Sequence, residues 1–286
     1  MPTLGLDVGA SKIYYVVLSA KGGPASGRDG EQRLLEAELK IQEQTKEAFF
    51  ELCRSINEQI KTKGLVIEKA GVGLPGTLKD GIAAKVTNLP ALEGLDASSE
   101  LQKIFAVPVR TVNDAKAFIY AEVTLGAAKG MRNVVGLTLG SGLGGGIVIN
   151  GDIYLGRGNA GEVSYLAWFD NDQKAEDFVS AKFFKKFGED PLALRNKAEA
   201  GDANAKSAYE EFGRNLGVII ANLVNLLDPD AIVLGGGLSA AYDLFIGQAK
   251  ETAAKLIVNP ESKAIAILKN ALGPAAGAIG AALLAQ

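Results

Sequence analysis

The chain contains the same strand, turn and strand pattern twice, and this repetition restricts its fold more than any other feature. In the first copy, the apolar segment Leu4–Leu18 is interrupted by a polar turn at Asp7–Lys12. In the second copy, the apolar segments Val134–Leu139 and Gly146–Ile149 flank the glycine-rich turn Gly140–Gly145. Apolar, β-branched runs on both sides of a turn predict a β-hairpin. A hairpin that occurs twice predicts an internal duplication.

An alignment of Gly5 with Gly136 extends the match between the two copies. It also pairs the following residues: Leu6 with Leu137, Gly9 with Gly140, and Val16, Val17 and Leu18 with Ile147, Val148 and Ile149.

Helical and strand-like segments alternate along the rest of the chain. Helical spacing is found in Glu31–Lys63, Glu176–Phe187, Ala203–Leu227, Leu238–Leu256 and Gly273–Leu284, and short strands are expected at Lys69–Val72, Val107–Val112, Ala231–Leu234 and Ala264–Leu268. This alternation predicts an α/β fold with helices covering the sheets. We expect two lobes with a cleft between them. Residues 1–113, with the C-terminal helix 272–286 packed on them, would form the smaller lobe, and residues 114–271 the larger one.

Composition narrows the possible partners. The 286 residues are 48% hydrophobic and carry a formal net charge of -3, and no block of Lys and Arg occurs anywhere. We therefore expect no nucleic-acid partner. The most apolar stretches, Leu216–Leu227 and Ala271–Ala285, are short or interrupted by Asn, Gly and Pro, so no membrane span is expected. The N-terminus lacks the basic segment of a signal peptide, which favours a cytoplasmic location.

Histidine is absent and Cys53 is the only cysteine. An intrachain disulfide, a Cys/His zinc site and a histidine base are therefore excluded. Carboxylates, hydroxyls, lysines and backbone amides remain. Phosphoryl transfer suits these groups, because it depends mainly on positioning and electrostatic stabilisation.

Three glycine-containing turns follow strand-like segments, where α/β proteins bind ligands. They lie at Asp7–Lys12, Gly140–Gly145 and Gly235–Gly237. The second turn matches G-x-G-x-x-G, but a strand follows it where a dinucleotide-binding fold needs a helix, so that interpretation is rejected. Consecutive backbone N–H groups in such turns can hold phosphate groups. The alternative is a tight hairpin that needs positive φ at its glycines.

Two aspartates stand out at strand ends. Asp7 lies within an apolar strand end, where it could hold the hydration shell of a Mg²⁺ ion or form an Asx-turn with its own backbone. Asp114 follows the strand Val107–Val112, where it could be catalytic or cap the next helix.

The order of these motifs resembles the sugar kinases of the ROK family, in the actin-like ATPase superfamily. The matching segments are Leu6–Lys12 (first phosphate loop), Gly73–Gly76 (G-x-P-G turn), Asn88–Pro90 (N-L-P), Val112–Ala115 (catalytic aspartate), Leu137–Gly146 (second phosphate loop), Gly161–Tyr165 (G-E-x-G-H) and Ile232–Ser239 (adenosine-side loop). The resemblance implies a two-lobed actin-like ATPase fold of the ribonuclease H-like type, with duplicated hairpin and helix units around a central cleft.

The resemblance also implies roles for particular residues. Asp114 would be the general base, and Asp7 would hold Mg²⁺ through water. The residues expected to bind ATP are Asp7, Gly9, Ala10, Ser11, Lys12, Thr138, Gly140, Ser141, Gly142, Gly235, Gly236 and Gly237. The residues expected to bind the sugar are Gly76, Asn88, Asn113, Asp114, Glu162, Tyr165 and Glu176. A homodimer is implied as well.

One segment departs from the family pattern. Tyr165 stands where the family has a histidine, and Leu166–Ala175 lacks the cysteines of the family's zinc segment. We therefore expect no zinc. The Tyr165 side chain could offer its hydroxyl to the sugar or pack against Trp168 and Phe169.

The leading hypothesis is an ATP-dependent, glucokinase-like kinase that phosphorylates a hexose or related sugar. Two alternatives stay open at this point: a catalytically weak sugar-binding regulator, and another actin-like kinase such as an acyl-phosphate kinase.

Overall fold

The computed structural model describes residues 2–19, 33–79, 81–86, 89–167 and 172–286. These residues form two compact units. The first unit contains residues 1–126, 155–160 and 272–286, and the second contains residues 127–154 and 161–271. The predicted boundary lies between residues 113 and 114, whereas the compact units divide after Gly126, because the helix that begins at Asp114 packs against the C-terminal helix.

The first unit is built on a five-stranded sheet with the order β3-β2-β1-β4-β7. Its elements are β1 (Thr3–Val8), β2 (Lys12–Leu18), β3 (Arg33–Lys40), α1 (Lys46–Thr62), β4 (Lys69–Leu74), β5 (Thr77–Lys79), β6 (Ile82–Lys85), α2 (Ala97–Phe105), β7 (Val109–Asn113), α3 (Asp114–Thr124) and α8 (Ala276–Ala285), with short 3-10 turns at Pro90–Leu92 and Gly273–Ala275. Strands β1, β4 and β7 are parallel, and β2 and β3 run antiparallel to their neighbours.

The second unit repeats this plan in a sheet with the order β10-β9-β8-β11-β12. Its elements are β8 (Val134–Leu139), β9 (Leu143–Ile149), β10 (Asp152–Ile153), α4 (Ala175–Phe178), α5 (Pro191–Glu199), α6 (Ala203–Leu227), β11 (Ala231–Gly235), α7 (Tyr242–Leu256) and β12 (Ala266–Lys269), with 3-10 turns at Val163–Tyr165, Ala181–Phe187, Gly237–Ala241 and Glu261–Ala264. The second hairpin and the two parallel strands beside it correspond one by one to those of the first unit, so the predicted duplication is present in the fold.

The strand register corrects one part of the proposed alignment. Gly5 pairs with Val16 in the first hairpin, and Gly136 pairs with Gly146 in the second. Val16 therefore corresponds to Gly146 and not to Ile147. The reason is that the second turn is one residue shorter than the first.

The helix predicted over Glu31–Lys63 is wrong in its first part. Residues Arg33–Lys40 form β3, and the helix α1 starts only at Lys46. The side chains of Leu35, Ala37 and Leu39 pack against the core, and the charged residues between them face solvent. This alternation has the period of a strand, and pairing with β2 satisfies its backbone groups.

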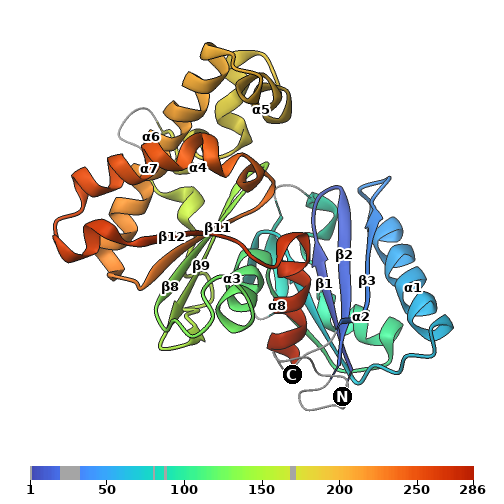
Figure 1. Ribbon diagram of the computed structural model, residues 1–286. Coiled ribbons are helices and arrows are strands. Elements are labelled where there is room, and N and C mark those ends of the chain that lie inside the picture. The colour runs from blue at the N-terminus through green and yellow to red at the C-terminus, as the bar shows by residue number, and fades with distance from the viewer. Residues whose placement is uncertain (1, 20–32, 80, 87–88, 168–171) are drawn as a thin grey trace. The chain divides into compact units, whose positions relative to one another are not determined.

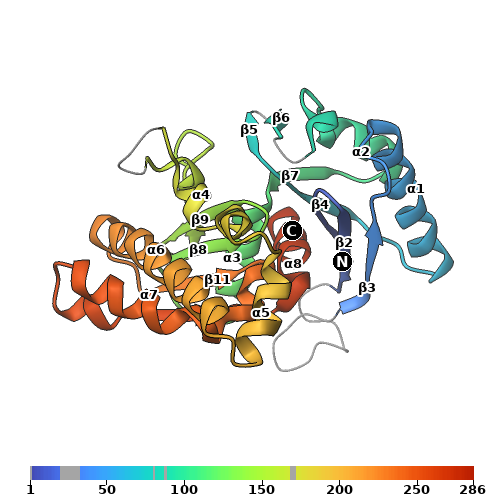
Figure 2. The same cartoon turned by 90° about the horizontal axis from the view of Figure 1, so that it is seen from above.

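Each face of the first sheet is covered by a different pair of helices. On one face, α1 and α2 pack against the inward side chains of β1 and β2, including Leu4, Leu6 and Tyr15. On the other face lies α8, with α3 beside it. Figures 1 and 2 both show α8 alongside the sheet and next to α3.

The backbone of α8 lies directly on bare glycines. A Cβ on Gly5 of β1 would lie 1.9 Å from the carbonyl oxygen of Ala278, and one on Gly71 of β4 would lie 1.8 Å from that of Ala281. A Cβ on Gly280 would lie 1.7 Å from the carbonyl oxygen of Ala117 in α3. No side chain other than hydrogen fits at these three positions.

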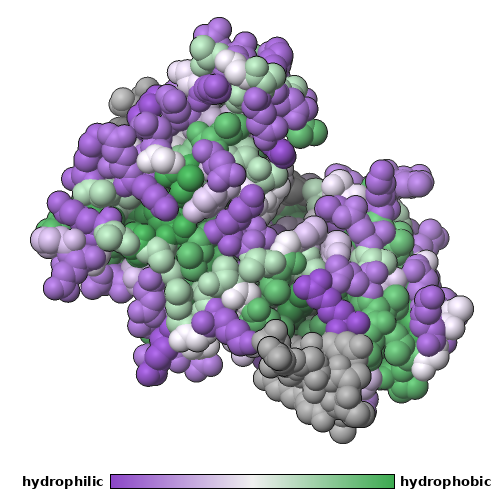
Figure 3. All heavy atoms as spheres, viewed as in Figure 1, coloured by the Kyte–Doolittle hydropathy of each residue, from purple (hydrophilic) through white to green (hydrophobic). Residues whose placement is uncertain are grey.

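The core of the second unit lies between its sheet and the helices α6 and α7. Phe184, Phe212 and Phe245 form a chain of ring contacts, with centroids 5.3 Å apart in each pair. The outward sides of these helices are polar. Figure 3 shows hydrophilic residues over much of the visible surface of this unit, with hydrophobic residues between them.

Within the described part of the chain, no helix combines the length and the apolar character that crossing a membrane requires.

The glycine contacts of α8 lead to a test with a matched control. We expect Gly280→Ala to lower the free energy of unfolding by about 1–3 kcal/mol, because the methyl group meets the α3 backbone. Gly247 in α7 has open space around its Cβ position. Gly247→Ala should raise the free energy of unfolding by about 0.5–1 kcal/mol through helix propensity. Urea denaturation of both variants measures these changes, and a Gly280→Ala variant as stable as the parent would refute the packing argument.

Candidate functional site

The two aspartates singled out by the sequence lie together in the first unit. Strands β1, β4 and β7 are parallel, so their carboxyl ends meet at one edge of the sheet. Asp7 is paired in register with Gly73, and Leu74 with Asn113. A Cβ on Gly73 would lie 3.5 Å from the Cα atom of Asp114 and 3.7 Å from Asp7 Oδ1. Gly73 therefore lies between the two acidic residues, within van der Waals contact distance of both.

The Asp7 carboxyl group is in an environment that disfavours its charge. Burial and the neighbouring Asp114 carboxylate raise its pKa to about 7, against the opposing effect of Lys12. Helix α8 contributes to the burial, because a Cβ on Gly277 would lie 2.3 Å from Asp7 Oδ2. A cation at this place would relieve the repulsion between the two carboxylates.

Asn113 caps the helix that follows β7. Its Oδ1 atom accepts a hydrogen bond from the backbone N–H of Lys116 at 3.1 Å. Its Nδ2 group donates to the carbonyl oxygen of Gly76 at 2.9 Å and so holds the turn in which Gly76 has a φ of 86°. Asp114 is the first residue of α3, and its Oδ1 atom accepts from the N–H of Ala115 at 2.8 Å. The capping role considered for Asp114 thus belongs to Asn113.

The first glycine turn connects β1 to β2. The N–H of Gly9 donates to the carbonyl oxygen of Lys12 at 2.9 Å, and the Gln44 side chain donates to that of Ala10 at 3.0 Å. The N–H of Ile41 donates to the carbonyl oxygen of Ser11 at 2.8 Å. The Lys12 ammonium group forms an exposed ion pair with Glu38 at 2.6 Å.

Asn88, predicted to bind the sugar, lies outside the described residues.

The second and third glycine turns lie against each other in the second unit. Gly236, with a φ of 81°, packs on the end of β8, and a Cβ there would lie 2.4 Å from the carbonyl oxygen of Leu139. Gly235 pairs with Thr138 in the sheet, and Gly237 begins the next 3-10 turn. These contacts bring residues 235–237 next to the turn that starts at Gly140.

The second turn does not need the positive φ that the hairpin interpretation assumed. Neither Gly140 nor Gly142 has a positive φ. The turn is closed by a hydrogen bond from the N–H of Gly140 to the carbonyl oxygen of Gly142 at 2.9 Å, next to Ser141. The carbonyl oxygen of Gly140 also accepts from the N–H of Ala181 at 2.8 Å. The glycines of this turn therefore allow another group to approach the backbone closely, and they are not required for an unusual backbone conformation.

Glu176, predicted to bind the sugar, has bonding partners beside this second turn. Its Oε2 atom accepts a hydrogen bond from the N–H of Leu143 at 3.2 Å, and its Oε1 atom forms an ion pair with Lys182. The structure thus places Glu176 where its carboxylate supports the second glycine turn.

Glu162 and Tyr165 follow a close contact between two backbones. A Cβ on Gly145 of β9 would lie 2.4 Å from the carbonyl oxygen of Gly161, so Gly161 is held directly on the strand. The Glu162 side chain makes no capping bond to the short helix after it. Tyr165 is 46% exposed, and the Lys174 ammonium group lies 4.3 Å from its ring centroid. Trp168 and Phe169, the alternative partners of Tyr165, lie outside the described residues.

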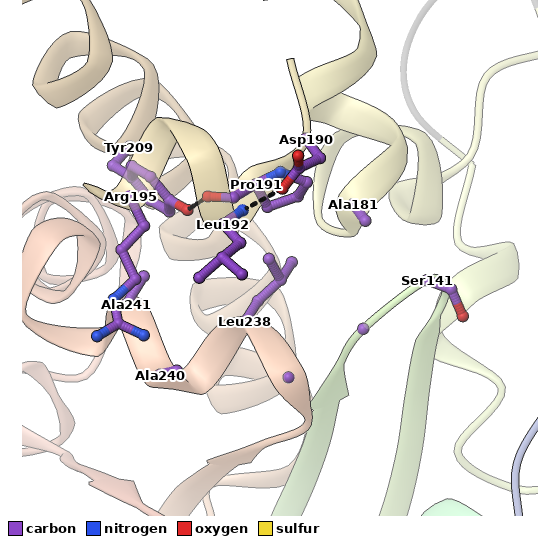
Figure 4. Close-up of a pocket in the computed structure, with 12 residues that line it drawn as sticks. Ser141, Ala181, Asp190, Pro191, Leu192, Arg195, Tyr209, Leu238, Ala240 and Ala241 are labelled. Atoms are coloured by element: carbon purple, nitrogen blue, oxygen red, sulfur yellow. Dashed lines mark hydrogen bonds between the residues drawn. The ribbon is translucent and has the colours of Figure 1, made fainter. Parts of the chain in front are cut away.

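A cavity of about 290 Å³ opens beside the second and third glycine turns (Figure 4). Its lining is mostly apolar and consists of Gly140, Ser141, Ala181, Asp190, Pro191, Leu192, Arg195, Tyr209, Gly237, Leu238, Ala240 and Ala241. A pocket of this size and character is suited to a small organic group, with the glycine turns available for an attached anion.

Sequence reasoning found only Gly140, Ser141 and Gly237 among these lining residues. It missed α5, which supplies Leu192 and Arg195. A signal for that helix was present, because Asp190 followed by Pro191 is a typical helix start. The Asp190 Oδ1 atom does cap α5, accepting from the N–H groups of Leu192 at 2.9 Å and Ala193 at 3.1 Å.

The predicted magnesium site can be compared with the carboxylates that the structure places near Asp7. No group of three or more His, Cys, Asp or Glu that could hold a metal ion occurs among the residues that the structure covers. A magnesium ion needs only one or two protein carboxylates when phosphates and water complete its shell. The donor set at Asp7, a buried carboxylate next to a second one, fits such an ion.

Comparisons with known proteins agree with this fold. The chain is 28% identical over 314 residues to the N-acetyl-D-glucosamine kinase of Photobacterium profundum, and the match covers 98% of both proteins. Solved structures are similar over the whole chain, among them two ROK family kinases. The ROK hexokinase from Thermus thermophilus matches with a TM-score of 0.79 and 26% identity, covering 100% of this chain and 98% of that one. The ROK family glucokinase from Streptomyces griseus, in complex with glucose and AMPPNP, matches with a TM-score of 0.81 and 24% identity, covering 100% and 99%.

These similarities confirm the predicted α/β fold of the actin-like type. The family model described as "ROK family" matches residues 3–176 and 185–286. Together with the repeated sheets and the glycine turns in family order, this match shows that the chain belongs to the ROK family.

Proposed function

We propose that this protein is an ATP-dependent kinase that phosphorylates a hexose or a related sugar. The observation that carries the proposal is the pair of carboxylates, Asp7 and Asp114, at the carboxyl edge of the first sheet. Membership of the ROK family, with sugar kinases among the similar proteins, supports it.

In this proposal Asp114 is the general base. It accepts the proton of the sugar hydroxyl as the oxygen of that hydroxyl forms a bond to the γ-phosphorus. The bond between the γ-phosphorus and the bridging oxygen breaks, and ADP leaves with the electron pair. The contact between Asp114 Oδ1 and the N–H of Ala115 fixes the carboxylate at the start of α3. Asn113 caps α3, so Asp114 is not required as the helix cap.

Asp7 would hold a magnesium ion through water. When bound, Mg²⁺ neutralises charge on the β- and γ-phosphates. The repulsion from Asp114 and the burial against α8 make the Asp7 carboxylate a group that gains stability from a nearby cation.

The second unit would bind the nucleotide. The amide groups around Gly140–Gly142 and Gly235–Gly237 are suited to phosphate oxygens, and the adjoining cavity is suited to the nucleoside. The sugar would be held by Glu162, with Asn88, Tyr165 and Glu176 as further candidates, and zinc would have no part.

The sugar kinase proposal is tested by an ADP-release assay with a panel of sugars, including glucose, mannose and their N-acetylated amines. We expect one or more sugars to raise ADP release far above the rate with ATP alone. Sugar binding without turnover would indicate a regulator instead. Turnover with a short carboxylic acid and with no sugar would indicate an acyl-phosphate kinase.

Asp114→Asn tests the base. The amide can still accept the hydrogen bond from Ala115, and Asn113 still caps the helix, so the fold and the sugar affinity should change little. Turnover should fall by about two orders of magnitude or more, which is the usual scale for loss of a positioned base. Steady-state kinetics and sugar titration of the variant measure the two effects. Near-normal turnover would leave Asp114 with a structural role only.

Glu162→Gln tests the sugar contact. If the carboxylate accepts hydrogen bonds from sugar hydroxyls, the amide loses one acceptor, and the cost should be about 1.5–3 kcal/mol. Sugar affinity would then fall by roughly one to two decades, while nucleotide affinity stays nearly constant. A lower melting temperature combined with unchanged sugar affinity would remove Glu162 from the binding site.

Asp7 predicts a pH dependence of stability in the protein without ligands. The pKa of the carboxyl group rises from 3.8 to about 7 on folding, so between these values the folded state binds a proton that the unfolded state has released. Stability contributed by this group therefore falls as pH rises through that window. The Asp7→Asn variant has no carboxyl group to titrate at this position, so its stability does not fall in this way. The melting temperature of the variant minus that of the parent should therefore increase from about pH 4 to about pH 7 and then level off.

The exposed Asp152 supplies a control for this measurement, because it lies on the surface of the second unit. An equal trend in Asp152→Asn would indicate a general effect of removing one carboxylate. A constant difference between Asp7→Asn and the parent over the whole range would contradict the assigned environment of Asp7.

A further inference from the structure

The nucleotide pocket of the second unit offers few polar groups to a base. Asp190 uses its Oδ1 atom to cap α5. The Tyr209 hydroxyl donates to the carbonyl oxygen of Pro191 at 2.6 Å. The other large side chains that line the cavity are Leu192 and Leu238. A base bound here would therefore meet mainly aliphatic surface.

Arg195 is the exception. It lies on α5 one turn before Glu199, and its Nε group donates to Glu199 Oε1 at 2.7 Å. Among the described residues, the hydrogen-bond contacts of its side chain are limited to this one. Arg195, Leu192 and Leu238 all line the cavity. Figure 4 shows the Arg195 guanidinium group beside Ala241, and the side chains of Leu192 and Leu238 close to each other.

The ion pair with Glu199 matters because it limits the rotation of the guanidinium plane. A guanidinium group is flat and delocalised, and it stacks well on the face of a planar ring. Such stacking is tolerant of base identity, because every base has a π-face. Selection of one base requires hydrogen bonds matched to its edge, and the Asp190 Oδ1 atom and the Tyr209 hydroxyl proton are already engaged within the protein.

We propose that Arg195 stacks on the base of the phosphoryl donor, and that the pocket accepts purine nucleoside triphosphates with little distinction between adenine and guanine. Glu199 is the positioning residue that orients the guanidinium group. This inference rests on the proposed function, since it assumes that the pocket receives a nucleotide. Pyrimidine nucleotides, with a smaller ring, would cover less of the aliphatic surface and bind more weakly.

The first experiment compares donors with the parent enzyme. We expect kcat/KM values for ATP, GTP and ITP to agree within about tenfold, and those for CTP and UTP to be lower. A preference for ATP over GTP of more than about 100-fold would overturn the proposed lack of selectivity.

The second experiment replaces the arginine. Arg195→Ala should raise the KM for ATP and for GTP by about tenfold, equivalent to about 1.4 kcal/mol, while the KM for the sugar stays constant. Arg195→Lys keeps the charge and loses the planar group, so it should lose most of the same affinity. An Arg195→Lys variant with parental KM would show that charge alone acts at this position and would overturn the stacking assignment.

Lys197 supplies the matched control. It lies on the same helix, forms a similar ion pair with Glu189 at 2.6 Å, and is not among the residues that line the cavity. Lys197→Ala should leave the KM for every nucleotide unchanged. If Lys197→Ala and Arg195→Ala raise the KM equally, a general effect of charge or of helix stability replaces the proposal.

Calorimetric titration of ADP into the protein without sugar separates this inference from the proposed function. If the parent protein binds no nucleotide, the proposed function fails and the inference fails with it. If the parent binds ADP and Arg195→Ala binds it equally well, only the role of Arg195 is overturned.

Discussion

The contact between the backbone of α8 and the first sheet is the constraint on which the sheet edge with Asp7 and Asp114 depends. Gly5 and Gly71 allow the helix to touch β1 and β4 without any intervening side chain, and Gly280 allows α3 the same approach. At the first turn of α8, Gly277 leaves space for the Asp7 carboxylate. Burial of that carboxylate next to Asp114 follows from this packing, and so does its raised pKa. A helix of larger residues would stand farther from the sheet and leave Asp7 in water.

This packing also explains why the acidic pair stands where three strands end. Parallel strands bring residues distant in the sequence to one edge, where Gly73 of β4 lies between Asp7 and Asp114. The second unit uses the same arrangement with different residues. There, strand ends carry the glycine turns and the cavity, and the carboxylate nearby, Glu176, is bonded to Leu143 and Lys182. The duplicated plan thus presents acidic groups in one unit and amide groups in the other.

Much of the fold could be predicted from the sequence. The repeated hairpin and the alternation of helices and strands predicted the α/β fold class correctly, because these patterns reflect which side chains are buried locally. The strand β3 was mistaken for helix, since residues 33–40 contain good helix formers and only pairing with β2 determines their conformation. The register of the second hairpin was wrong by one residue, because the length of a turn is not visible in the strands that it connects.

The candidate site was predictable where it follows a strand end, as for Asp7, Asp114 and the glycine turns. Two kinds of information were missing. Which of the two residues, Asn113 or Asp114, caps α3 depends on where the helix begins. The cavity depends on Leu192, Arg195 and Leu238, which come from separate elements and have no common motif.

The central claim is that the γ-phosphoryl group of ATP is transferred to a sugar hydroxyl. It is tested most directly by following ³²P from [γ-³²P]ATP in the presence of Mg²⁺ and a sugar that stimulates ADP release, with chromatographic separation of the products. We predict that the label moves into a sugar phosphate in a one-to-one ratio with ADP. Label recovered only as ATP and inorganic phosphate, with every sugar tried, would contradict this account.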